Sequence, residues 1–175
     1  MRYYDCMIVE FKNISSIRKN HPGKKLIFAS GSFDLTHAGH VLFLEDAKAQ
    51  GEILAVMVGG DEVIRHNKGP DRPIVNEHLR LKMIDSLKPV DYTILDTDSH
   101  HNPHQLDFLK TVFSEMKPDA YVVNDDGYDL PYRRMLAAEY NVPIIVLPRN
   151  APPEFKTPST TKIIEKLREI KEEGI

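Results

Sequence analysis

The sequence predicts an α/β fold in which about five parallel strands form one doubly wound sheet with helices on both faces. Apolar, strand-like runs alternate with stretches of helical periodicity along most of the chain, which is the pattern of repeated β–α–β units. The run 52–58 is apolar at nearly every position, as expected for a parallel strand that is covered on both faces. Right-handed crossovers leave few arrangements, and ligands in such sheets bind beyond the carboxyl ends of the strands.

The elements are expected in a regular order along the chain. Residues 1–22 form a lead-in, in which apolar residues spaced by three predict a short helix that ends before Pro22. These residues are Ile8, Phe11, Ile14 and Ile17. The remaining residues, 23–175, are expected to form a single domain. Its strands are expected at 26–30, 52–58, 91–95, 120–123 and 143–147. Its helices are expected at 41–50, 61–66, 76–87, 104–116 and 131–140, and from residue 159 onward.

Glycine and proline mark the ends of these elements. Gly51 ends the first helix of the domain, and the proline-bearing segments 67–73 and 148–158 are expected to be loops. Helical spacing also predicts which faces are buried. In helix 76–87 the inner face is expected to carry Leu79, Met83 and Leu87. In the last helix a core-facing stripe is expected from Ile163, Ile164, Leu167 and Ile170.

Composition and charge exclude several classes of protein. The 175 residues are 41% hydrophobic and 28% charged, as in ordinary globular domains. The net charge of −3 and the lack of a basic stripe argue against nucleic-acid binding. One cysteine, Cys6, excludes an internal disulfide and is typical of a reducing compartment. Neither a signal peptide nor an apolar run long enough to span a membrane is evident, so we expect a cytoplasmic protein without a membrane partner.

The segment from Gly31 to His40 is the strongest functional signal. It reads Gly-Ser-Phe-Asp-Leu-Thr-His-Ala-Gly-His and joins an expected strand to an expected helix. Backbone N–H groups and the helix dipole at such a junction favour a bound anion, and Gly31 lacks a Cβ that would keep a phosphate away. His37 and His40 lie three residues apart, so both imidazoles face the same side of the first helical turn. The segment therefore predicts a phosphate-handling site.

This segment resembles the G-x-F-D-x-x-H-x-G-H signature of the cytidylyltransferase-like nucleotidyltransferases. The resemblance implies a Rossmann-like fold for residues 23–175 and a catalytic role for His37 and His40. It also implies contacts to the nucleotide from other residues of the signature. These are Gly31, Ser32, Phe33, Asp34 and Gly39.

Two further segments match the family in order. The resemblance implies that Lys68, in the loop after the third expected helical stretch, and Arg80, on the next helix, contact the triphosphate and act in catalysis. Arg72 is implied on the acceptor side. At the last helix, hydroxyls at the N-terminus favour phosphate binding, although N-capping alone would explain them. The nucleotide-binding residues expected there are Ser159, Thr160 and Thr161.

A third segment departs from the family. Residues 124–126 and 147–149 resemble the Gly-Asp-Asp-Trp and Leu-Pro-Arg-Thr segments of glycerol-3-phosphate-type cytidylyltransferases. They place Asp125 and Arg149 at the nucleotide and Asn124 and Asp126 at the acceptor. Asn124 replaces the family's glycine, and nine residues separate Arg149 from Ser159. The segment 23–91 and the Ser-Thr-Thr helix resemble the adenylyltransferase domain of the ADP-heptose synthases at least as closely, so CTP and ATP both remain open as donor.

The resemblance implies transfer of CMP or AMP from CTP or ATP to a small phosphorylated sugar or alcohol, with release of pyrophosphate. Mg²⁺ is the expected cofactor, held mainly by the nucleotide phosphates, so no dedicated metal site is expected. A homodimer is compatible with the family. The alternative is a non-catalytic nucleotide-binding regulatory module, against which the full set of cationic residues argues. The histidine-rich loop 100–104 suits an acceptor-side role better than a transition-metal site.

Overall fold

The computed structural model describes residues 7–97, 104–148 and 159–172. It contains a single parallel sheet of six strands in the order β1-β4-β3-β2-β5-β6. The strands are β1 (Met7–Val9), β2 (Leu26–Gly31), β3 (Ile53–Val58), β4 (Tyr92–Leu95), β5 (Ala120–Asn124) and β6 (Ile144–Leu147). This is the Rossmann-like α/β architecture expected from the sequence, with one strand more than the expected five.

Helices connect the strands. They are α1 (Ser15–Asn20), α2 (Ala38–Lys48), α3 (Asp61–Lys68), α4 (Glu77–Asp85), α5 (Phe108–Thr111), α6 (Leu130–Glu139) and α7 (Thr160–Glu172). A 3₁₀ turn, η1 (Phe11–Asn13), precedes α1, and a π-helical turn, η3 (Val112–Met116), continues α5. No helix within these described ranges is long and apolar enough to cross a membrane.

The additional strand lies in the expected lead-in helix. Residues 7–9 pair in parallel with β4, so the helical prediction for this part of residues 1–22 is wrong. The three-residue spacing of the lead-in fits the observed structure only from η1 onward, because Ile8 belongs to the edge strand and is 50% exposed. Ile14 and Ile17 are fully buried and pack into the same core as Phe28 of β2.

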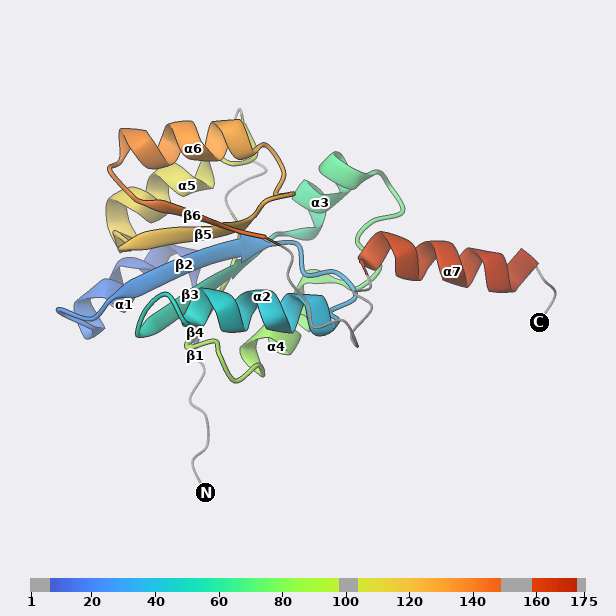
Figure 1. Ribbon diagram of the computed structural model, residues 1–175, viewed down its shortest axis with the longest axis horizontal. Coiled ribbons are helices and arrows are strands. Elements are labelled where there is room, and N and C mark those ends of the chain that lie inside the picture. Colours follow the sequence, from blue (N-terminus) through green and yellow to red (C-terminus); the bar gives the residue numbers. More distant parts are fainter. Residues whose placement is uncertain (1–6, 98–103, 149–158, 173–175) are drawn as a thin grey trace, which may run out of the picture.

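Helices cover both faces of the sheet (Figure 1), and an apolar layer of side chains lies on each face. Alternate residues of each strand enter opposite layers, so that Leu26 and Phe28 face one side and Ile27 and Ala29 the other. The first layer packs under α1, α5, η3 and α6. The second packs under α2 and α4. Burial on both faces explains why the strands read as continuous apolar runs.

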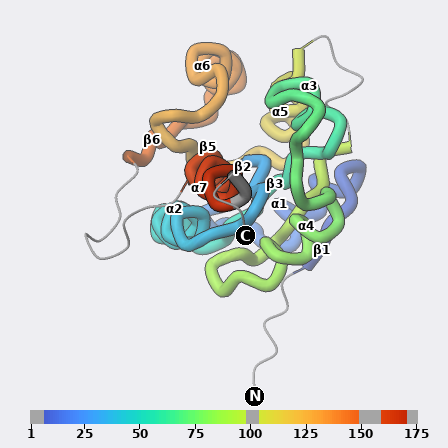
Figure 2. Tube along the Cα trace, turned by 90° about the vertical axis from the view of Figure 1, so that its right-hand side faces the viewer, coloured from blue at the N-terminus to red at the C-terminus, as the bar shows by residue number. Residues whose placement is uncertain are grey.

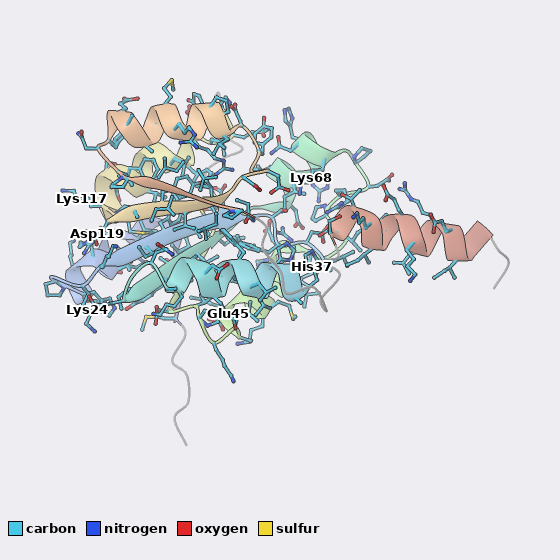
Figure 3. All side chains as sticks on the ribbon, in the orientation of Figure 1. Lys24, His37, Glu45, Lys68, Lys117 and Asp119 are labelled. Carbon is cyan, nitrogen blue, oxygen red and sulfur yellow. The ribbon has the colours of Figure 1, made fainter. Side chains whose placement is uncertain are left out.

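The strand order indicates at which end of the sheet a ligand would bind. The chain runs from β2 outward to β3 and β4, then returns to β5 on the other side of β2. The order therefore reverses between β2 and β5, and the carboxyl ends of these two strands form the crevice where such sheets bind ligands. His37 and Lys68 lie at this end, and Lys24, Lys117 and Asp119 lie at the opposite end (Figure 3).

Helix α7 begins at this crevice and extends away from the body (Figure 1), pointing toward the viewer in Figure 2. Its expected core-facing stripe is not buried: Leu167 is 58% exposed, and Ile163 and Ile164 are half-buried. The inner face of α4 also differs from expectation. Leu79 is 57% exposed, whereas Arg80, Leu81 and Ile84 are buried.

Candidate active site

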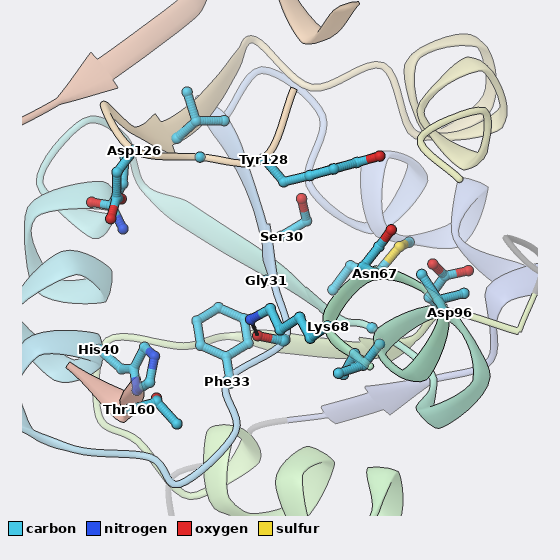
Figure 4. A pocket seen from close by; sticks show the side chains of 18 of the residues that line it. Ser30, Gly31, Phe33, His40, Asn67, Lys68, Asp96, Asp126, Tyr128 and Thr160 are labelled. Atoms are coloured by element: carbon cyan, nitrogen blue, oxygen red, sulfur yellow. Dashed lines mark hydrogen bonds between the residues drawn. The ribbon is translucent and has the colours of Figure 1, made fainter. Parts of the chain in front are cut away.

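A cavity of about 550 Å³ opens beyond the carboxyl ends of β2, β3 and β5 (Figure 4). Its walls come from the β2–α2 loop, α3, the β5–α6 loop and the N-terminus of α7. Most of the residues predicted from the sequence line it. They are Gly31, Ser32, Phe33, His37, His40, Lys68, Arg72, Asn124, Asp126, Ser159, Thr160 and Thr161.

The two histidines form a stacked pair at the start of α2. Their ring centroids are 4.0 Å apart, and the ring planes are inclined by 23°. Nδ1 of His37 accepts a hydrogen bond from the Gly39 backbone N–H at 3.1 Å, and Nδ1 of His40 accepts one from the His37 N–H at 3.3 Å. Because Nδ1 of each ring is an acceptor, the neutral imidazoles carry their protons on Nε2. Each ring thus has an Nε2–H donor on its outer edge.

The signature loop is shaped by its own side chains. Phe33 and Leu35 have φ values of 49° and 46°, a left-handed conformation that costs non-glycine residues about 1–2 kcal/mol each. The Phe33 ring packs edge-on against His40, with centroids 5.5 Å apart, and occupies space that a Cβ on Gly31 would reach at 3.0 Å. Gly31 therefore serves the packing of Phe33 as well as the approach of a ligand.

Asp34 holds this loop in place and does not face the cavity. Its carboxylate is buried and accepts hydrogen bonds from the backbone N–H groups of Ile74 and Val75, each at 3.0 Å. Nε of Arg72 forms an ion pair with it at 2.8 Å. Burial by itself would raise the pKa of Asp34, but these three donors outweigh it and lower the pKa below 3.8. The expected nucleotide contact of Asp34 is thus replaced by a structural role.

Arg80 is a second correction. Only 1% exposed, it lies beneath the cavity. Nη1 donates to the carbonyl oxygens of Ser32 at 2.6 Å and Gly59 at 2.7 Å, while Nη2 pairs with Asp61 at 2.7 Å. Nε donates to the carbonyl of Val75 at 2.8 Å. Four of its five N–H donors are used in this way, so Arg80 ties the ends of β2 and β3 to α4. It is not among the residues that line the cavity.

Lys68 supplies a cation to the cavity from the last turn of α3. Its ammonium donates to Oγ of Ser32 at 2.9 Å, the contact drawn in Figure 4. Although much of the side chain is exposed, burial of the ammonium against the cavity wall lowers its pKa below 10.5, and the Arg72 guanidinium lowers it further. An anionic ligand at this position would favour the charged form and oppose this lowering of the pKa.

The N-terminus of α7 forms another wall of the cavity. Oγ of Ser159 accepts from the backbone N–H of Lys162 at 3.2 Å and so caps the helix. The Thr160 hydroxyl donates to the carbonyl of Asp34 at 2.9 Å and attaches α7 to the signature loop. Capping and docking thus account for two of the three hydroxyls, and the remaining N–H groups of the first turn, with the helix dipole, favour an anion.

Two further predicted residues, Gly39 and Asp125, do not line the cavity. Gly39 is not part of the cavity lining, because its N–H is directed at His37. Asp125 is exposed outside the cavity, and its N–H is bonded to the carbonyl of Leu147 at 3.1 Å. The nucleotide contacts expected of these two residues are therefore not supported. Arg149 lies outside the described residues, as do residues 100–103 of the histidine-rich loop. His104 is described, and pairs with Asp129 at 3.2 Å.

The structure adds residues that sequence reasoning missed. They are Ser30 on β2, Gln105 before α5, Tyr128 before α6 and Arg133 on α6, all of which line the cavity. Asp96, directly after β4, lines it as well. The signal for Arg133 was its position on the helix: it lies three and four residues before Leu136 and Ala137, which are buried. The described residues contain no group of three or more histidine, cysteine or carboxylate side chains that could hold a metal ion.

Comparison with known proteins agrees with this geometry. A family model described as "Cytidylyltransferase-like" matches residues 28–166. The chain belongs to the cytidylyltransferase-like family. Among curated proteins it is 36% identical over 150 residues to the bifunctional protein HldE of Alcanivorax borkumensis. The match covers 84% of this chain and 28% of that protein, so the chain spans little more than a quarter of this relative's length.

Solved structures of related fold include a lipopolysaccharide core biosynthesis protein from Thermoplasma volcanium, with 30% identity and a TM-score of 0.58. That similarity covers 74% of this chain and 99% of the other. A pantoate-β-alanine ligase from Francisella tularensis aligns with a TM-score of 0.63 at 18% identity, covering 90% of this chain and 75% of the other, which shows a shared fold. Family membership and the HldE match support the enzyme class predicted from the sequence, a nucleotidyltransferase.

Proposed function

We propose that this protein transfers a nucleoside monophosphate from a nucleoside triphosphate to a small phosphorylated sugar or alcohol and releases pyrophosphate. One observation carries the proposal: the cavity brings the Nε2–H edges of His37 and His40, the Lys68 ammonium and the first turn of α7 to the end of β2. These groups are hydrogen-bond donors or cations, which is what a triphosphate and its transition state require.

The reaction needs alignment and charge stabilisation. An oxygen of the acceptor phosphate attacks the α-phosphorus, forming a new phosphorus–oxygen bond. The bond from the α-phosphorus to the bridging oxygen breaks, and pyrophosphate leaves with the electron pair. The acceptor oxygen is already anionic at neutral pH, so no general base is needed. His37 and His40 donate hydrogen bonds to the α-phosphate as charge develops, and Lys68 follows the charge to the leaving pyrophosphate.

The nucleotide enters as its magnesium complex. Mg²⁺ prefers oxygen ligands and keeps much of its coordination from phosphates and water. A cavity lined by only scattered carboxylates, such as Asp96 and Asp126, suits an ion that arrives with the nucleotide.

ATP is the preferred candidate donor, and CTP is the second. The similarity to HldE, together with the resemblance of residues 23–91 to the adenylyltransferase domain of ADP-heptose synthases, favours ATP. The 30% identity to a lipopolysaccharide core biosynthesis protein favours a phosphorylated sugar over an amino alcohol.

The test is a pyrophosphate-release assay that crosses ATP, CTP, GTP and UTP with phosphorylated sugars, polyols and amino alcohols. The proposal expects one donor and one phosphorylated acceptor to give turnover at least tenfold above that of either alone. Tight nucleotide binding without turnover on any acceptor would instead support a regulatory binding module. Release with unphosphorylated acceptors alone would contradict the proposed nucleophile.

A further inference from the structure

Arg133 is a buried cation that the proposed transfer does not use. It lies on α6, in the wall of the cavity formed by the β5–α6 side, and is 8% exposed. Nε donates to the carbonyl oxygen of Tyr128 at 2.7 Å. Nη1 donates to Oγ of Ser30 at 3.3 Å and to the hydroxyl of Tyr121. Every one of these acceptors is neutral.

No carboxylate among the described residues forms an ion pair with Arg133. Its second terminal nitrogen, Nη2, also makes no hydrogen bond with any residue in the described part of the chain. The guanidinium centre lies 5.8 Å from the centroid of the Tyr121 ring. The cation–π attraction at this distance offsets only part of the free-energy cost of removing the charge from water. Burial lowers the pKa of Arg133 to about 10, so the side chain remains charged at neutral pH.

A buried charge without a counter-ion is costly. A neutral glutamine side chain could also donate hydrogen bonds to the Tyr128 carbonyl and to the hydroxyls, at a lower desolvation cost. A purely structural role therefore does not explain why the side chain is charged. An anion in the cavity would complete the arrangement, with Nη2 as the unused donor. Arginine suits phosphate and carboxylate because its planar fork matches their two oxygens.

The position of Arg133 separates it from the expected triphosphate site. Ser30, which Arg133 contacts, and Tyr128 lie toward one end of the cavity, and His40 and Thr160 lie toward the other, with Lys68 between them (Figure 4). Gln105 lines the same cavity, and its buried Oε1 has no hydrogen-bond partner in the described residues.

We propose that Arg133 is the anion-binding residue of the acceptor subsite, where it holds the non-attacking oxygens of the acceptor phosphate, or a carboxylate of the same molecule, while another phosphate oxygen attacks the α-phosphorus. Only the identification of the anion as part of an acceptor rests on the proposed function. Binding of an anion at Arg133 does not depend on whether the protein catalyses the transfer. The assignment predicts that acceptors are selected for a negative charge at this end of the cavity.

The test compares three-carbon probes that differ in one group: glycerol 3-phosphate, glycerate and glycerol. They are titrated calorimetrically into protein saturated with the α,β-methylene analogue of ATP or CTP, whichever binds more tightly, so that the triphosphate site is occupied. If neither analogue binds, the titration uses the protein alone. We expect an anionic probe to bind at least tenfold more tightly than glycerol. The better of the two anions identifies the group.

The variants are Arg133→Gln, Arg133→Lys and the matched control Arg134→Gln, which removes an exposed arginine next along α6. Arg133→Gln should lower anion affinity at least tenfold while leaving the affinity for the nucleotide analogue within about twofold. Arg133→Lys keeps the charge and should retain part of the anion binding, which also covers the case that the glutamine variant does not fold. Arg134→Gln should match the wild type.

Unchanged anion affinity in a folded Arg133→Gln protein would overturn the assignment, as would equal binding of all three probes to the wild type. A parallel loss of analogue binding would also overturn it, because it would indicate a structural role or a triphosphate contact. Anion binding that requires Arg133, in a protein that releases no pyrophosphate with any acceptor, supports this inference and rejects the proposed transferase. The two proposals therefore fail separately.

Discussion

The imidazole rings of His37 and His40 stack 4.0 Å apart at the first turn of α2, each held through Nδ1 by a backbone N–H of the same turn. This relationship fixes the tautomer of both rings and presents two Nε2–H donors to one side. The backbone N–H of Gly39, which lies between the two histidines in the sequence, orients His37. The pair is both a helix cap and a set of preorganised donors.

Replacing His40 with alanine should reduce turnover by about two to four orders of magnitude, because a donor to the developing charge on the α-phosphate is lost. Loss of the cap should cost only about 1 kcal/mol of stability. The measurement is kcat from pyrophosphate release, with the unfolding midpoint recorded in parallel. His78→Ala, at an exposed position on α4, is the matched control and should behave as the wild type. Near-normal kcat for the His40 variant would contradict its catalytic role.

Lys68 should make nucleotide affinity depend on pH. Its pKa is lowered below 10.5 by burial and by Arg72, so the ammonium loses its proton at a lower pH than a free lysine. A lysine binds phosphate in its protonated form, so the affinity for a non-hydrolysable triphosphate analogue should fall as the pH rises through this lowered value. Lys68→Met should weaken binding at neutral pH by about tenfold to a hundredfold and remove this dependence. An unchanged pH profile in the variant would assign the dependence to another group.

Asp34 should contribute stability that acid removes. Its folded pKa lies below the value of 3.8 expected in the unfolded chain, so the contribution is fully present above that value and is lost as the pH falls through the lower folded value. Asp34→Asn should cost about 3 kcal/mol of unfolding free energy near neutral pH, because Arg72 loses its buried partner. Urea denaturation from pH 7 to pH 2 measures both effects. Asp71→Asn, at the exposed position directly before Arg72, is the control and should change neither the stability at neutral pH nor its loss in acid.

Arg80 should behave as a structural residue and not as a phosphate ligand. Arg80→Lys keeps the charge but lacks the fork that joins the carbonyls of Ser32 and Gly59, so we expect a loss of about 3 kcal/mol in unfolding free energy. Triphosphate affinity of the folded fraction should change by less than about threefold. If the variant kept wild-type stability but lost nucleotide binding, the result would contradict this structural role and support the triphosphate contact that the family resemblance implies.

The wrong prediction of the inner face of α4 has a specific cause in the periodicity of that helix. Leu79 and Met83 suggest an inner face that the structure shows to be rotated by about one residue, toward Arg80, Leu81 and Ile84. Apolar spacing identified the helix, but it did not show that an arginine and an aspartate share its buried side. The reason lies in tertiary structure. The carbonyl oxygens of Val75, Ser32 and Gly59 and the carboxylate of Asp61 meet at the Arg80 guanidinium, and the sequence of α4 by itself does not indicate this.

The strands of the core were predictable because burial on both faces leaves continuous apolar runs such as 53–58. The edge strand β1 was not, since it has three residues and only Val9 is buried. The cavity wall formed by the segment from Gly31 to His40 was predictable because its residues are contiguous in the sequence. Arg133 could not be assigned in the same way. Its burial without a charged partner is a result of the packing of α6 over β5, which the sequence does not show directly.

The most direct test of the central claim is a crystal structure with the α,β-methylene analogue of the preferred triphosphate. Our account predicts the α-phosphate within hydrogen-bond distance of Nε2 of His37 and His40, with the β- and γ-phosphates near Lys68 and the first turn of α7. A triphosphate bound at another surface, or one whose α-phosphate lies out of reach of both imidazoles, would contradict it.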